Sequence, residues 1–203
     1  MTDRKTTLNA LERNAWVLFL VAGLLAVVFA TNTYLTTFAG TSYPIIGDVI
    51  GPAGFLLGVI GLFGLYPGLA DRRPKLARGV AAIAVIPAVG WGAIIVHSIG
   101  ELLGVLGEWS GPGQIIPPVT VVTMILGFGL FGATIIYTRA YSRIIGGFVL
   151  LESAMFLVLM LGVAPYFVMI DIGHLVAFLG IGIALRITGT LSGSTEPAPD
   201  STA

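Results

Sequence analysis

The chain has 203 residues, of which 56% are hydrophobic and only 10% are charged, and its mean hydropathy is +0.99. Because an ordinary soluble domain is about 25% charged, this composition predicts an integral membrane protein. The net charge is zero and no long basic run occurs, so nucleic acid is not an expected partner, and the lack of cysteine excludes disulfides and thiol chemistry.

Six apolar runs follow one another along the chain, and each is about as long as the 20 or so residues that a membrane-spanning helix needs. Short segments rich in glycine, proline or charged residues separate the runs. We therefore predict an all-α polytopic integral membrane protein with six transmembrane helices. The predicted helices cover residues 15–35, 45–66, 79–102, 116–137, 144–163 and 167–187.

The basic residues predict the orientation of these helices. With six spans, every lysine and arginine falls on the same side, and cytoplasmic loops are the ones that carry an excess of these residues. Both termini are therefore expected in the cytoplasm, in a multi-pass protein of the cell membrane. The ten basic residues are Arg4, Lys5, Arg13, Arg72, Arg73, Lys75, Arg78, Arg139, Arg143 and Arg186.

The ends of the chain differ in composition from the predicted bundle. We expect residues 1–14 to form a short cytoplasmic segment and residues 15–188 to form the six-helix bundle. The first apolar run is longer than the hydrophobic region of a signal peptide, so we expect it to be retained as a helix. Residues 189–203 are rich in Ser, Thr, Pro and Gly, which predicts a disordered cytoplasmic tail.

A stripe of glycines follows one face of the second predicted helix, from Gly47 to Gly64. Small residues let the backbones of membrane helices approach closely. Two interpretations are open, namely packing within one bundle or a seam between chains in a homo- or hetero-oligomer. Besides a second chain bound at this seam, the expected partner is the lipid bilayer. The stripe consists of Gly47, Gly51, Gly54, Gly58, Gly61 and Gly64, spaced by three or four residues.

Most of the strongly polar embedded residues fall in the outer half of the predicted bundle. His97 and Glu101 lie near the outer end of the third helix and share a face at positions i and i+4. Asp171 and His174 lie in the first turns of the sixth helix and share a face at i and i+3. If these two helices are neighbours, the four side chains could converge. Glu152 lies near the middle of the fifth helix, where an ionisable residue is a functional candidate.

Three chemistries would use this polar cluster. His97, Glu101, Asp171 and His174 could hold a metal ion whose bound water attacks an ester or amide, with Glu152 as the catalytic base. His97 and His174 could instead be the axial ligands of a b-type haem. Without any cofactor, the same groups could form a proton-sensitive hydrogen-bond network. The simplest interpretation is that they only stabilise hydrated helix ends.

The sequence contains no specific catalytic motif. We therefore expect a non-enzymatic assembly, binding or sensor component with an outward-facing polar cluster. The alternative is a membrane-embedded enzyme, such as a metal-dependent hydrolase, or a haem protein. A transporter or channel is less favoured, because the inner half of the predicted helices offers few polar groups to line a path.

Overall fold

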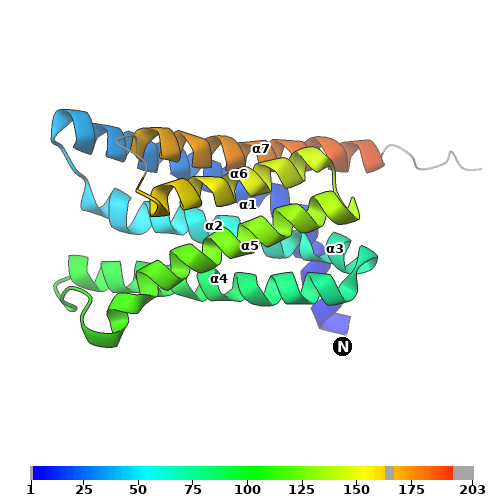
Figure 1. Cartoon of the computed structure of the whole chain (residues 1–203), viewed down its shortest axis with the longest axis horizontal. Helices are drawn as coiled ribbons and strands as arrows, with labels where there is room; N and C mark the ends of the chain where they lie inside the picture. The colour runs from blue at the N-terminus through cyan, green and yellow to red at the C-terminus, as the bar shows by residue number, and fades with distance from the viewer. Residues whose placement is uncertain (1, 163–166, 194–203) are drawn as a thin grey trace, which may run out of the picture.

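The computed structural model describes residues 2–162 and 167–193 of the chain. Every regular element within these residues is a helix, and the long helices run along one common direction (Figure 1). This confirms the prediction of an all-helical chain with six candidate spans, and indicates a multi-pass membrane protein. The stretches long and apolar enough to cross a membrane are Ala10–Ala39, Ile46–Arg72, Pro74–Leu102, Gly111–Thr138, Arg143–Met160 and Val168–Thr188.

The six candidate spans are built from seven α-helices and two short helical turns in the part of the chain that the structure describes. In chain order these are α1 (Thr2–Ala39), the π-helical turn η1 (Ile46–Ile50), α2 (Gly51–Gly64), α3 (Tyr66–Arg72), α4 (Pro74–Leu102), the 3-10 turn η2 (Gly111–Ile115), α5 (Ile116–Thr138), α6 (Arg143–Met160) and α7 (Phe167–Gly193).

Prolines explain why the second span is divided into η1, α2 and α3. Pro52 follows η1 at the start of α2, and Pro67 lies in the first turn of α3. Proline has no N–H to donate to the preceding turn, but it is accepted in the first turn of a helix, where that N–H has no helical partner. The sequence pattern predicted one continuous span here, and the turn at Leu65 interrupts it without changing the number of spans.

The outer limits of the bundle differ from the predicted boundaries. α1 begins at Thr2, inside the segment predicted to precede the bundle, and α7 continues to Gly193, five residues into the predicted tail (189–193). The remainder of that tail, residues 194–203, lies outside the described residues, as does Val163 at the end of the fifth predicted helix.

The helices form a closed ring in chain order. Each of α1, α2, α4, α5, α6 and α7 packs against the next, and α7 returns to pack against α1. α3 extends α2 and packs mainly against α4. In this arrangement α4 and α7 lie on different sides of the bundle (Figure 1).

Aromatic side chains fill the interior of the ring around Phe55 of α2. The ring of Phe55 lies 5.1 Å from that of Trp91, 4.9 Å from that of Phe156 and 6.3 Å from that of Phe178, measured between centroids. A further contact at 6.1 Å joins it to Phe29. Aromatic pairs at such distances are attractive beyond their burial alone, so Phe55 links α2 to α1, α4, α6 and α7.

The glycine stripe of α2 makes room for these rings. A Cβ atom at Gly61 would lie 2.8 Å from the ring of Phe19 of α1, and one at Gly58 would overlap the ring of Phe178 of α7. The stripe is thus used for packing within one chain, which was the simpler of the two interpretations. The oligomer seam stays a prediction that these contacts do not require.

We expect Gly64→Ala to lower the stability of the bundle. A Cβ atom there would lie 2.6 Å from the Cβ of Ala15 and 3.0 Å from the carbonyl oxygen of Leu11, so α1 and α2 would have to separate. Overpacking of this kind typically destabilises by about 1–3 kcal/mol. Thermal unfolding in detergent measures the change.

Gly79→Ala is the matched control for that substitution. Gly79 lies in α4, and a Cβ atom there would meet nothing within 4 Å. Alanine is the better helix former by about 1 kcal/mol, so this variant should be neutral or more stable. Equal destabilisation by the two variants would contradict the proposed role of Gly64 in close packing.

Candidate functional site

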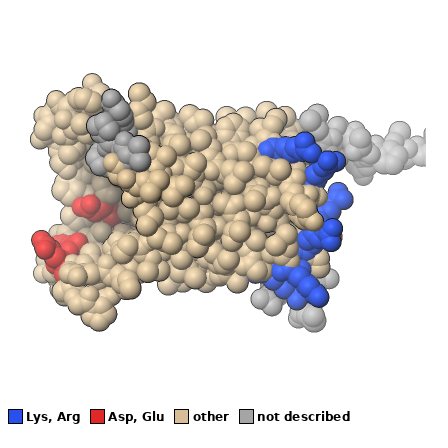
Figure 2. Space-filling view, in the orientation of Figure 1, with Lys and Arg blue, Asp and Glu red and all other residues tan. Residues whose placement is uncertain are grey.

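Charged side chains lie at the two ends of the bundle. Figure 2 shows the lysines and arginines gathered at one end and the visible aspartates and glutamates at the other. The basic end holds the turn between α3 and α4 and the loop between α5 and α6. The acidic end holds the C-terminus of α4, where His97 and Glu101 lie.

His97 and Glu101 form a partly exposed pair at the acidic end. His97 Nε2 lies 3.4 Å from Glu101 Oε1, and the two side chains are 15% and 35% exposed. The indole of Trp109 stacks on the imidazole with centroids 3.7 Å apart. Asp48 of η1 is close enough to Glu101 for an electrostatic interaction. The expected i, i+4 pairing is therefore present, at a partly exposed position.

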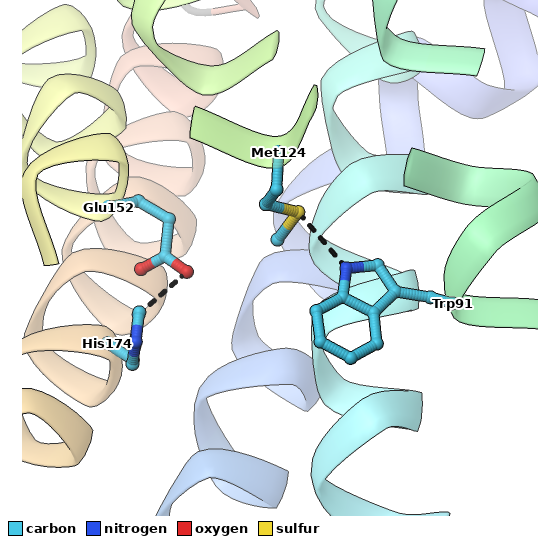
Figure 3. A network of polar contacts seen from close by, with 4 residues as sticks. All are labelled: Trp91, Met124, Glu152 and His174. Carbon is cyan, nitrogen blue, oxygen red and sulfur yellow. Dashed lines mark hydrogen bonds and ion pairs between the residues drawn. The ribbon is translucent and has the colours of Figure 1, made fainter. Parts of the chain in front are cut away.

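Glu152 and His174 form a second pair that is fully enclosed. Glu152 projects from α6 and His174 from α7, and His174 Nδ1 lies 2.9 Å from Glu152 Oε1 (Figure 3). The side chains are 0% and 2% exposed. The packing of α6 against α7 thus brings together two ionisable side chains that lie in different predicted spans.

The surroundings of this buried pair are mostly aromatic. The imidazole of His174 lies 4.5 Å from the ring of Phe156 and 5.1 Å from that of Phe55. Asp171, one turn earlier on α7, interacts electrostatically with His174 and lies near the hydroxyl of Thr33 of α1, which donates to the carbonyl of Phe29. Buried polar groups normally have partners, so this short polar chain holds α1, α6 and α7 together.

Two carboxylate oxygens beside the pair lack partners. Glu152 Oε2 and Asp171 Oδ2 are buried, and neither has a hydrogen-bond partner among the described residues. A buried acceptor without a partner destabilises the fold unless it carries a proton or binds another group. The site therefore has capacity for an additional proton.

A second polar contact lies across the aromatic interior from the pair. The indole Nε1 of Trp91 on α4 donates to the sulfur of Met124 on α5 at 3.3 Å (Figure 3). Phe156 lies between the two contacts, with its ring 6.3 Å from that of Trp91. Packed aromatic rings therefore connect His174 of α7 to Trp91 of α4.

The four residues predicted as metal ligands fall in separate places. α7 packs against α1 and α6, whereas α4 packs against α2, α3 and α5, so His97 and His174 belong to different sites. In the described part of the chain, no three His, Asp or Glu side chains gather closely enough to hold a metal ion. The predicted metal ligands do not converge on one point, and neither do the two histidines predicted as haem ligands. The metal and the haem hypotheses both remain predictions.

Glu152, predicted as a catalytic base, contacts His174, and the catalytic role stays a prediction. The sequence did not identify Thr33, Phe55, Phe156 or Trp109 as neighbours of the two pairs. The only available signal was position along the spans, since Thr33 lies near the end of the first candidate span and Asp171 near the start of the sixth, which places both toward the same end of the bundle. This position alone does not reveal which helix faces which.

Comparison with known protein families, curated proteins and solved structures found no match to this chain. The function must therefore be argued from the site itself.

At the basic end, Tyr141 connects two parts of the bundle. It lies in the loop between α5 and α6, outside the candidate spans, and its hydroxyl donates to Glu12 Oε1 of α1 at 3.0 Å. Burial raises the pKa of Tyr141 well above its ordinary range, and the charge of Glu12 and this hydrogen bond add to the rise. The hydroxyl therefore keeps its proton when a free tyrosine would lose it.

The Glu152–His174 pair is expected to show strong coupling in a double-mutant cycle. Glu152→Leu or His174→Leu alone leaves a buried polar partner unsatisfied, which costs about 1–3 kcal/mol. The double variant should lose less stability than the sum of the two losses, because replacing both partners leaves no orphan. Unfolding in detergent measures all three variants.

His97→Leu and Glu101→Leu provide the comparison for that cycle. This pair has the same residue types but is partly exposed, and exposed pairs contribute about 0–1 kcal/mol. If the coupling free energy of His97 and Glu101 is as large as that of Glu152 and His174, burial is not what makes the Glu152–His174 interaction strong.

Alkaline pH should destabilise the fold through Tyr141. Above about pH 10 the unfolded chain loses the tyrosine proton while the folded chain keeps it. The stabilisation is therefore complete below that pH and is lost as the pH rises beyond it. Tyr141→Phe should lose about 0.5–1.5 kcal/mol at neutral pH and show a smaller further loss between pH 9 and pH 11.

Unfolding measured across this pH range, with phenolate absorbance, tests the expectation. Tyr137→Phe is the control, because Tyr137 is 71% exposed. If Tyr141→Phe loses as much stability at high pH as the wild type, another group causes the alkaline loss.

Proposed function

We propose that this chain is a non-enzymatic sensor component of the cell membrane, with the Glu152–His174 pair as its proton-responsive element. The observation that carries the proposal is the 2.9 Å contact between a carboxylate and an imidazole that are both almost fully buried. An ionisable residue embedded in a membrane bundle is a functional candidate, and histidine is the side chain whose charge changes most readily near neutral pH.

The proposed orientation has both termini in the cytoplasm. The gathering of basic residues at one end supports it, because cytoplasmic segments carry the excess of lysine and arginine. The acidic end, with His97 and Glu101, then faces outward. The Glu152–His174 pair lies beneath that outer end, next to Asp171.

Gain or loss of a proton would change the helix packing around the pair. With a charged imidazole and carboxylate, the two groups attract strongly and hold α6 against α7. When the Glu152 carboxylate is protonated as well, the imidazolium of His174 loses the counter-charge in direct contact with it, and a buried charge without a close partner is highly unfavourable. Asp171 is the one further charged group that interacts with the pair among the described residues, and it would share in the response.

The experiment uses the absence of cysteine in the chain. Spin labels on Val96→Cys of α4 and Met169→Cys of α7 report the distance across the ring, since both side chains are exposed and their helices do not pack together. We expect the distance distribution in reconstituted protein to shift between pH 5 and pH 8. Glu152→Gln should abolish the shift.

His97→Gln in the same labelled background is the matched control, because His97 belongs to the partly exposed pair. This variant should keep the shift. A wild-type distance that does not change with pH would overturn the sensor proposal, and a shift lost only in His97→Gln would move the sensor to the outer pair.

A further inference from the structure

A polar pocket lies at the basic end of the bundle, well away from the Glu152–His174 pair. Its volume is about 400 Å³, and it is lined by Arg72, Arg73, Tyr137 and Thr138. These residues come from the turn between α3 and α4 and from the last turn of α5. Two helical hairpins of the ring therefore contribute to one pocket.

The two guanidinium groups of the pocket are not used by the fold. Neither Arg72 nor Arg73 forms a salt bridge with a carboxylate in the described part of the chain. Asp71 precedes them in the sequence but does not line the pocket. Two adjacent arginines without an acidic partner favour a ligand that carries negative charge.

The remaining donors favour an anion with several oxygen atoms. Tyr137 is 71% exposed and lines the same pocket, so its hydroxyl is a further donor available there. Thr138 contributes little as a donor, because its hydroxyl already donates to the carbonyl of Thr134 at 2.7 Å. Arginine forks bind phosphate oxygens in a bidentate manner, so two arginines and one tyrosine match a phosphate group.

The helix termini around the pocket act in opposite directions. Arg73 is the N-cap of the 29-residue helix α4, whose N-terminal partial positive charge favours an anion. The C-terminus of α5 lies on the other side and carries a partial negative charge, with Arg139 at its C-cap. The backbone dipoles thus oppose each other, and the preference for an anion rests on the arginine side chains.

The position of the pocket at the ends of the candidate spans indicates which kind of molecule could present a phosphate group to it. Arg72 ends one candidate span, Arg73 immediately precedes the next, and Tyr137 lies in the last turn of a third. Headgroups of a bilayer lie at this level, and basic pockets between membrane helices on the cytoplasmic side bind anionic lipid headgroups. Tyrosine is also favoured at the interface of a membrane.

We infer that the pocket of Arg72, Arg73 and Tyr137 binds a phosphate group, presented by the headgroup of an anionic phospholipid. This goes beyond the proposed sensor function and does not depend on Glu152 or His174. A soluble phosphate would use the same donors, so the experiment distinguishes the two sources.

Native mass spectrometry of the detergent-purified full chain measures retained lipid. Phosphatidylglycerol and phosphatidylcholine are added in parallel. The wild type should retain phosphatidylglycerol preferentially, and R72Q/R73Q should bind it roughly tenfold more weakly, because charge-assisted hydrogen bonds are lost. R72K/R73K keeps the charge and the basic loop but loses the bidentate geometry, so its affinity should be intermediate.

K75Q/R78Q is the matched control. It removes two positive charges from the start of α4 that do not line the pocket, and it should retain phosphatidylglycerol like the wild type. Equal loss in K75Q/R78Q and R72Q/R73Q, or equal retention of both lipids by the wild type, would show general attraction to charge and overturn the inference.

Inorganic phosphate is the probe for a soluble source. If it raises the thermal stability of lipid-free wild type but not of R72Q/R73Q, the phosphate site is supported and its source is soluble. If it has no effect while phosphatidylglycerol is retained through the two arginines, the lipid headgroup is the ligand. Binding of neither probe by a folded wild type would overturn the site.

Discussion

Close approach between a glycine face on α2 and aromatic rings on its neighbours is the constraint on which the rest of this bundle depends. Helices in a membrane gain little from the hydrophobic effect between themselves, so close packing must hold them together. Gly58 and Gly61 leave spaces that Phe178 and Phe19 occupy. Phe55, on the same helix, fills the centre of the ring. This arrangement holds α2 against α1, with the ring of Phe178 of α7 beside its glycine face, and the ring of helices closes in chain order.

Ring closure also determines which polar groups meet. Because α7 lies between α1 and α6, His174 reaches Glu152 and Asp171 reaches Thr33. α4 lies elsewhere in the ring, so the ionisable partner of His97 among the described residues is Glu101 on its own helix. The two histidines, which occur in similar sequence settings, therefore have different environments. One is stacked under Trp109 near water, and the other is enclosed by phenylalanines.

The sequence predicted the spans well because hydrophobicity and length are local properties. The i, i+4 contact of His97 with Glu101 was predictable for the same reason, since helix geometry sets it. The Glu152–His174 contact depends on which helices are neighbours, and apolar runs of equal length carry no such information. Pro52 and Pro67 are sequence signals for the division of the second span. The uninterrupted apolar run around them nevertheless led to the prediction of one continuous helix. The contact of Tyr141 with Glu12 joins residues far apart in the chain and had no local signal.

The distribution of buried polarity favours a sensor over a carrier. From the Glu152–His174 pair toward the acidic end, Asp171 of α7 and Thr33 of α1 are further polar side chains. Toward the basic end, the next buried residues on α6 and α7 include Val149 and Phe178, both 0% exposed. A carrier needs polar groups on both sides of its central site. The polarity along α6 and α7 therefore fits the proposed sensor better, since a sensor needs to exchange protons with one compartment alone.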